Sequence, residues 1–122
     1  MTLRIAAGLL LAIAPVAAAA MPVSTFLAKA ERLERKGPLA LFSGDMKLLQ
    51  NQVKADGAAL RAERLAARAA GKRPAYCPPD RMAMGFKEVL GAMRQVPPAR
   101  RAATDTRDAL RAYFADRFPC PA

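Results

Sequence analysis

Residues 76–121 read YCPPDRMAMGFKEVLGAMRQVPPARRAATDTRDALRAYFADRFPCP, and this stretch decides the fold that the sequence predicts. Two apolar stripes at helical spacing flank the Pro97–Pro98 pair, with Cys77 before the first stripe and Cys120 after the second. Helices that are joined by a short loop pack antiparallel, which brings Cys120 back to the neighbourhood of Cys77. The stretch therefore predicts a C-terminal helical hairpin that is closed by one disulfide.

Residues 1–20 have the pattern of a secretory signal peptide. Arg4 precedes an apolar run over residues 5–16, and a small-residue tract that ends at Ala20 fits the cleavage rule. The run is shorter than the roughly 20 apolar residues that a membrane span needs, and it contains Pro15. We expect cleavage near Ala20, export to the periplasm without insertion into the membrane, and a mature chain of residues 21–122 that forms one domain.

Cys77 and Cys120 are the only cysteines of the 122-residue chain. An even number of cysteines in an exported chain is typical of disulfide pairing. A zinc site and a reactive thiol are the alternatives, but the chain has no histidine to complete a metal site or to serve as a base. We therefore expect a structural disulfide, no metal and no cofactor.

Glycine and proline residues divide the mature chain into four helical segments, and no long stretch alternates with the period of a strand. Helix N-caps are predicted at Ser24 or Thr25 for the first segment and at Asp80 for the third. The second segment begins after Pro38 or after the break at residues 43–45 and runs to about residue 70, and the fourth covers about residues 99–117. The predicted fold class is all-α, a small four-helix domain.

The second segment is amphipathic, with an apolar side and a basic side. Lysine or arginine recurs every seven residues at Lys47, Lys54, Arg61 and Arg68, and Lys72 extends this basic row. Such a row is normally the solvated face, and a docking surface is the alternative interpretation. The predicted core stripe consists of Phe42, Met46, Leu49, Val53, Leu60 and Ala67.

The third segment carries a methionine-rich stripe. Methionine fills irregular gaps in cores and also lines adaptable binding grooves, and we favour the core interpretation here. The stripe consists of Met82, Phe86, Val89, Leu90, Met93 and Val96.

The charge balance favours an anionic partner. The chain has 20 Lys plus Arg against 10 Asp plus Glu, a formal net charge of +10. Nucleic acid is not expected, because an exported protein seldom meets it and the few aromatic residues lie on the apolar stripes rather than on a stacking platform. An acidic protein surface or an anionic envelope polymer fits better. Leu41, Leu48 and Leu65 lie off the main stripe and leave room for a homodimer contact.

Catalytic residues are scarce. Without histidine the chain lacks the commonest general base, and neither Ser24 nor Ser43 lies in a nucleophile motif. The carboxylate pairs at residues 31 and 34 and at residues 105 and 108 fall among basic neighbours on exposed helix faces. We therefore expect a protein that is not an enzyme and that acts by binding another protein.

The cysteine motifs resemble those of the Rap/Tai family of type VI secretion immunity proteins. In that family a Cys-Pro pair opens one helix and a Phe-Pro-Cys sequence closes the next, and here these motifs are Cys77-Pro78 and Phe118-Pro119-Cys120. The similarity covers residues 76–121. It implies that Cys77 and Cys120 form the family's structural disulfide, with Pro78 and Pro119 as its flanking prolines.

The resemblance also implies a function and a binding site. It implies a periplasmic helical domain that binds a type VI secreted peptidoglycan amidase and blocks it by occlusion. In related immunity proteins an inter-helical loop plugs the groove of the amidase. The corresponding candidate partner-binding residues are Gln95, Val96, Pro97, Pro98, Arg100 and Arg101.

A second class of function stays open. The N-terminal half, at residues 40–46, departs from the glycine-rich, aromatic-containing pattern of the family. The basic row on the second segment suits a non-enzymatic periplasmic structural or adaptor protein that binds anionic envelope components. Salt dependence separates the two functions, because a diffuse charged contact is screened at high ionic strength and occlusion of a groove is not.

Overall fold

The computed structural model describes residues 20–122, so the predicted signal peptide lies outside the described residues except for Ala20. The described chain is all-α, with four α-helices, two short 3₁₀ helices and no strand, which confirms the predicted fold class. The elements are α1 (Val23–Lys36), η1 (Gly37–Phe42), α2 (Gly44–Ala69), α3 (Phe86–Arg94), η2 (Pro98–Arg100) and α4 (Thr106–Arg117). Within this part of the chain, no helix combines the length and the apolar character that a membrane crossing requires.

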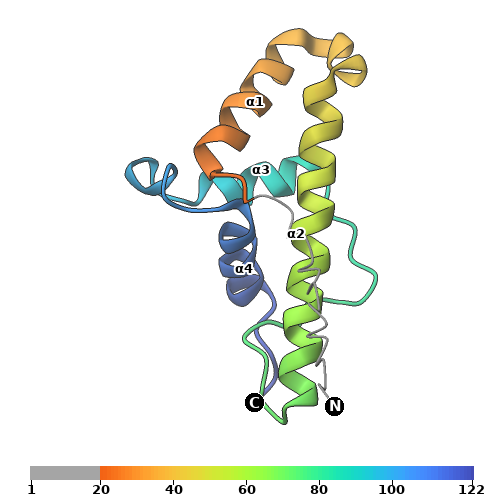
Figure 1. The fold of residues 1–122 in the computed structure, drawn as a ribbon, viewed down its shortest axis with the longest axis vertical. Helices are drawn as coiled ribbons and strands as arrows, with labels where there is room; N and C mark the ends of the chain where they lie inside the picture. Colours follow the sequence, from red (N-terminus) through yellow and green to blue (C-terminus); the bar gives the residue numbers. More distant parts are fainter. Residues whose placement is uncertain (1–19) are drawn as a thin grey trace, which may run out of the picture.

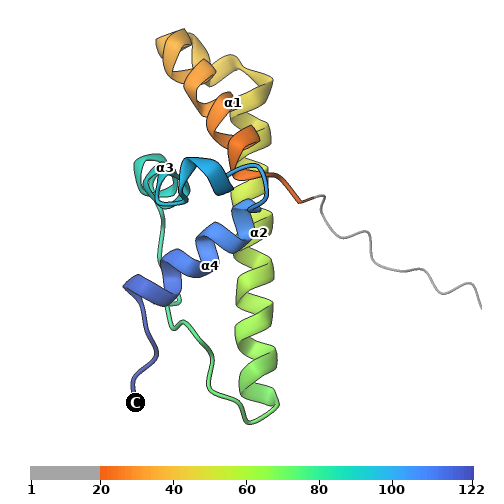
Figure 2. The same cartoon turned by 90° about the vertical axis from the view of Figure 1, so that its left-hand side faces the viewer.

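Helix α2, with 26 residues, is the longest helix of the described chain. Figure 1 shows it spanning the height of the fold, with α1 and η1 at its upper end and α4 beside its lower half, whereas α3 packs on α1 and α4 and is set apart from α2 in Figure 2. After α2 the chain returns as an extended segment, residues 70–85, to reach α3, and Figure 2 shows this return on the side where α4 lies. The chain thus places α4 and the C-terminal tail beside the lower half of one long helix.

Local sequence explains the ends of α1 and α2. Gly37 adopts a φ of 57°, a left-handed conformation that ends α1, and Pro38 follows it in η1. The Ser43 hydroxyl accepts a hydrogen bond from the Asp45 backbone N–H at 3.3 Å, so the second of the two predicted starts of this helix is confirmed. Gly71, with a φ of 70°, follows its C-terminal end.

The predicted cap of the first helix is wrong. Helix α1 begins at Val23, so Ser24 and Thr25 lie inside its first turn. The first free N–H groups are satisfied by a distant segment instead: Val23 N donates to Thr104 O at 2.8 Å, and Ser24 N donates to Arg101 O at 3.1 Å. A tertiary contact therefore replaces the side-chain cap.

Helix α3 is shorter than the sequence predicts. Asp80 is not its N-cap, because the helix begins at Phe86 after Gly85. The Asp80 carboxylate instead accepts from Arg64 of α2 at 3.3 Å, and the Pro78-Pro79 pair keeps the preceding chain extended.

Helix α4 also begins later than predicted. It starts at Thr106 rather than near residue 99, and residues 98–104 form a 3₁₀ turn followed by further turns. The connection between α3 and α4 therefore covers residues 95–105. Figures 1 and 2 show α3 and α4 crossing each other, so the hairpin is more open than the short Pro-Pro loop suggests.

The core lies where α1, α2, α3 and α4 meet. Most of the predicted stripes point inward, but Phe42 is 88% exposed and Phe86 is 37% exposed, so both predictions of burial are wrong. Met46, Val53, Met82 and Val96 are only partly buried and pack on the edge of the core. The largest fully buried apolar side chains are Val23, Phe26, Leu49, Leu60, Met93 and Leu110.

Candidate functional site

The predicted disulfide is confirmed. The sulfur atoms of Cys77 and Cys120 are 2.00 Å apart, and the Cys77 backbone N–H donates to Phe118 O at 2.7 Å. Neither cysteine lies in a helix: Cys77 belongs to the extended return segment and Cys120 to the tail after α4. The bond thus fastens the return segment to the C-terminal tail.

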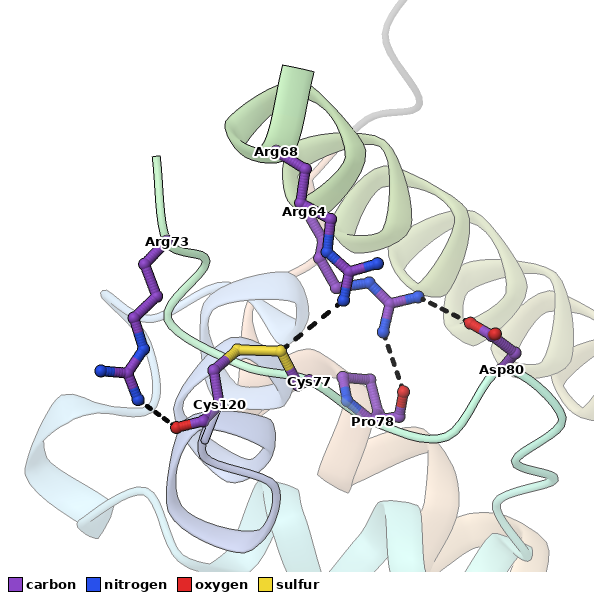
Figure 3. The surroundings of a disulfide bond; sticks show 7 residues. All are labelled: Arg64, Arg68, Arg73, Cys77, Pro78, Asp80 and Cys120. Carbon is purple, nitrogen blue, oxygen red and sulfur yellow. Dashed lines mark hydrogen bonds and ion pairs between the residues drawn. A yellow bond between two sulfur atoms is a disulfide. The ribbon is translucent and has the colours of Figure 1, made fainter. Parts of the chain in front are cut away.

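Three arginines surround this disulfide, as Figure 3 shows. Arg64 of α2 donates to Pro78 O at 2.8 Å, and Arg68 approaches the Cys77 sulfur at 3.8 Å. Arg73 donates to the carbonyl oxygen of Cys120. Together these bonds hold both cysteine-bearing segments against the lower end of α2.

Arg64 was not predicted as a structural residue, although it is only 6% exposed. The sequence does contain an indication of its burial, because Arg64 falls four residues after Leu60 and three before Ala67, on the apolar side of α2. A long charged residue on a core stripe indicates a buried partner, which here is the carbonyl of Pro78.

The loop between α3 and α4 is braced from within. The Arg101 guanidinium donates through Nε to Val96 O at 2.8 Å and through Nη2 to Arg94 O at 3.1 Å. The Thr104 hydroxyl donates to Arg100 O at 2.8 Å. Arg101 therefore ties the second half of the loop to its start, and its side chain is engaged by the protein itself.

A second set of bonds fixes the loop to α1 and α2. Its residues 101–104 accept from the first two N–H groups of α1, and Thr106 N donates to Met21 O at 2.9 Å. The Thr106 hydroxyl donates to the buried carboxylate of Asp56 at 2.6 Å, and Gln52 donates to the same carboxylate at 3.0 Å. Figure 1 shows the loop projecting sideways from the helices.

The six candidate partner-binding residues lie together on this loop. Val96 and Arg101 are half-buried, and the other four, Gln95, Pro97, Pro98 and Arg100, are exposed. Beside the loop is a shallow cavity of about 310 Å³, lined in part by Gln95, Val96, Pro97 and Arg100. Arg100 is thus the loop arginine that faces outward, whereas Arg101 braces the loop.

Two acidic side chains of the lower half, Glu63 and Asp108, form ion pairs with Arg111. Arg111 donates to both carboxylate oxygens of Glu63, at 2.7 and 3.1 Å, and it also pairs with Asp108. The hydrogen bond from Arg111 lowers the pKa of Glu63, against the opposing effect of burial. Burial and a hydrogen bond to Glu63 raise the pKa of Tyr76 to about 12.

Neither predicted carboxylate pair forms an acid–base site in the described residues. Glu31 and Glu34 are exposed on α1, and Glu34 pairs with Arg94 at 3.3 Å. Asp108 pairs with Arg111, while Asp105 precedes the first residue of α4. Residues 20–122 also hold no cluster of three or more metal-ligating side chains.

The basic row runs along α2 and ends at Lys72, just after the helix. Lys47, Lys54, Arg61, Arg68 and Lys72 are all exposed, as a solvated face requires. An exposed row of this kind is also free to attract an anionic partner.

The fold and the loop define a small, disulfide-bonded helical domain that presents a braced loop and a basic helix face. Comparison with known proteins adds no relative: no protein-family model, no curated protein and no solved structure matches this chain. The resemblance to the Rap/Tai family therefore rests on the sequence of residues 76–121, and above all on its two cysteine motifs.

Proposed function

We propose that this protein is a periplasmic immunity protein that binds and occludes a type VI secreted peptidoglycan amidase. The observation that carries the proposal is the braced loop of residues 95–105, which projects from the fold while hydrogen bonds hold both of its ends. A loop that inserts into an enzyme groove binds more tightly when it is ordered beforehand, because less conformational entropy is lost on binding.

The composition of the loop suits such an insertion. Pro97 and Pro98 restrict the backbone and present apolar surface, and Arg100 adds an outward-facing charge. Desolvated apolar contacts at the centre supply most of the affinity of an interface, whereas charges at its rim mainly set orientation and encounter rate. Arg100 is therefore expected to pair with an acidic group near the mouth of the amidase groove.

The disulfide supports the export that this function needs. Disulfides persist in oxidising compartments such as the periplasm, and the pairing of Cys77 with Cys120 fits a protein that works there.

The test is a binding titration against each type VI secreted amidase that is encoded in the genome of the source organism. One of these enzymes should bind the native protein, and Arg100→Glu should weaken binding by about tenfold or more. Arg35→Glu makes the same charge change at an exposed position of α1 and should leave the affinity within about twofold. Equal losses in the two variants would show that overall charge, not the loop, governs binding.

The exposed basic row on α2 favours a second candidate function, that of an adaptor on anionic envelope components. Such an adaptor should bind isolated anionic cell-wall polymer at low ionic strength and release it as salt screens the charges. Amidase binding through the loop should survive the same increase in salt. The two functions therefore differ in a single salt titration.

A further inference from the structure

An apolar groove lies at the opposite end of α3 from the braced loop. It has a volume of about 490 Å³ and is walled by α1, η1, α2 and the start of α3. Its apolar lining includes Phe26, Leu41, Met46, Leu49, Val53, Met84, Phe86 and Val89.

The mouth of this groove is unusually apolar for a free surface. Leu41 is 75% exposed, and its neighbours Leu39 and Phe42 in η1 are exposed as well. Phe86, which also lines the groove, is exposed too. Contiguous exposed apolar surface on a folded protein marks a site of interaction more often than chance.

Positive charge borders the groove along one edge. Lys54 lines it directly, and Lys47 precedes Lys54 by seven residues on the same side of α2. Among the described residues that line the groove, none is acidic. Asp45, at the start of α2, is already paired with Lys29 at 3.2 Å. An approaching partner therefore meets an apolar floor beside a cationic edge.

We propose that this groove binds an amphipathic helix of a partner protein, with the apolar face of that helix on the groove floor and acidic side chains along its flank. Recognition of a helix in a groove uses such an arrangement of apolar anchors and flanking charge. Met46 and Met84 suit it, because unbranched methionine side chains adapt to the shape of the partner. This site is separate from the loop and does not depend on the proposed immunity function.

Charge argues against a second copy of this chain as the occupant. The chain carries a formal net charge of +10, and a second copy would bring its own basic row towards Lys54. An acidic partner helix avoids that repulsion, because its carboxylates are attracted to the cationic edge of the groove.

The direct test uses synthetic helical peptides of roughly 18 residues, a length that supports a helix. The first carries a leucine and phenylalanine face with glutamate flanks, the second has lysine flanks, and the third replaces the apolar face with serine. Isothermal titration with the disulfide-bonded protein should show binding of the first peptide, at least about tenfold weaker binding of the second, and none of the third.

Matched variants place the binding in the groove. Leu41→Glu, in the groove, should weaken binding of the glutamate peptide by about tenfold, whereas Leu65→Glu, on α2 outside the groove and 50% exposed, should not. Lys54→Glu should weaken binding of the glutamate peptide more than Lys72→Glu does, although both variants change the net charge equally. All four positions are exposed, so the variants are expected to fold.

Four results would overturn the proposal. The first is equal binding of the glutamate and lysine peptides, and the second is equal effects of the two leucine variants. The third is concentration-dependent self-association in sedimentation that Leu41→Glu abolishes, which would make the groove a homodimer contact. The fourth is binding to vesicles of anionic phospholipid, lost in Leu41→Glu, without binding of any peptide.

Arg100→Glu should leave peptide binding unchanged, so failure of the groove proposal and failure of the immunity function are distinguishable.

Discussion

Asp56 shows how a single buried carboxylate can organise distant parts of the chain. It lies in the middle of α2, is 1% exposed, and accepts hydrogen bonds from Gln52 and from the Thr106 hydroxyl at the start of α4. Buried carboxylates require such partners, because an unsatisfied buried acceptor is costly. Asp56 therefore joins the middle of α2 to the end of the braced loop.

Removal of the Thr106 hydroxyl should destabilise the protein. Thr106→Val keeps the shape of the side chain but leaves the Asp56 carboxylate without one donor, so we expect the free energy of unfolding to fall by about 1–3 kcal/mol. Thr25→Val makes the same change at an exposed position of α1 and should alter the free energy of unfolding by less than about 0.5 kcal/mol. Urea denaturation measures both, and similar values for the two variants would contradict the role of this hydrogen bond.

Glu63 should make stability depend on pH in the acid range. Arg111 lowers the pKa of Glu63 in the folded state, so the ion pair stabilises the fold at pH values above the ordinary carboxyl pKa near 4.5. This stabilisation is lost as the pH falls through the lowered pKa of Glu63 in the folded protein. Glu63→Gln should therefore be less stable than the native protein at about pH 6, and this deficit should shrink by about pH 3. Urea titrations at both pH values measure the difference, and a constant difference would contradict the coupling.

At the scale of elements, Arg101 should control the order of the loop that precedes α4. Arg101→Ala removes two charge-assisted bonds, to Val96 O and Arg94 O, of about 1.5–3 kcal/mol each, so amide exchange over residues 95–105 should speed up by about a hundredfold or more. Arg100→Ala removes an outward-facing arginine from the same loop and serves as the matched control. Equal exchange in the two variants would show that the loop needs no brace.

The sequence predicted the elements whose ends are set locally and missed those set by tertiary contacts. Gly37 and Ser43 mark the end of α1 and the start of α2 by their own conformation and hydrogen bonding. By contrast, Asp80 resembles an N-cap but is bound by Arg64, and this pairing is visible only once α2 lies beside the return segment. The late start of α4 has the same origin, because Thr106 is held by Asp56 and by the backbone of Met21.

The candidate site was predicted in part for the same reason. Residues 95–101 were identified from the family resemblance, and the disulfide from the two cysteines, but the different roles of Arg100 and Arg101 depend on which guanidinium reaches the loop carbonyls. The sequence favours a core over a groove for the methionine-rich stripe, because Phe86 follows the helical period of a core stripe, as Phe42 does in the second segment. Their exposure comes from the ends of η1 and α3, which the period alone does not reveal.

At the scale of the whole molecule, the disulfide should be a main source of stability. It joins residues 43 apart in sequence, and the chain-entropy model gives about 4 kcal/mol for a loop of this size. The double variant Cys77→Ser/Cys120→Ser should therefore unfold at a much lower urea concentration than the oxidised protein. Dithiothreitol should lower the midpoint of the native protein to a similar degree and leave that of the double variant unchanged. Equal midpoints for the oxidised protein and the double variant would show that the arginines around the bond suffice to hold the tail.

Occlusion by the braced loop is the central claim, and it is tested most directly by the rate of peptidoglycan hydrolysis. A type VI secreted amidase that is found to bind this protein in the titration is assayed on purified peptidoglycan while the protein is titrated in. We predict that hydrolysis stops at one equivalent of the native protein, at low and at high salt alike, and that Arg100→Glu inhibits about tenfold more weakly. Full hydrolysis in the presence of saturating native protein, or inhibition that disappears as salt is added, would contradict the account.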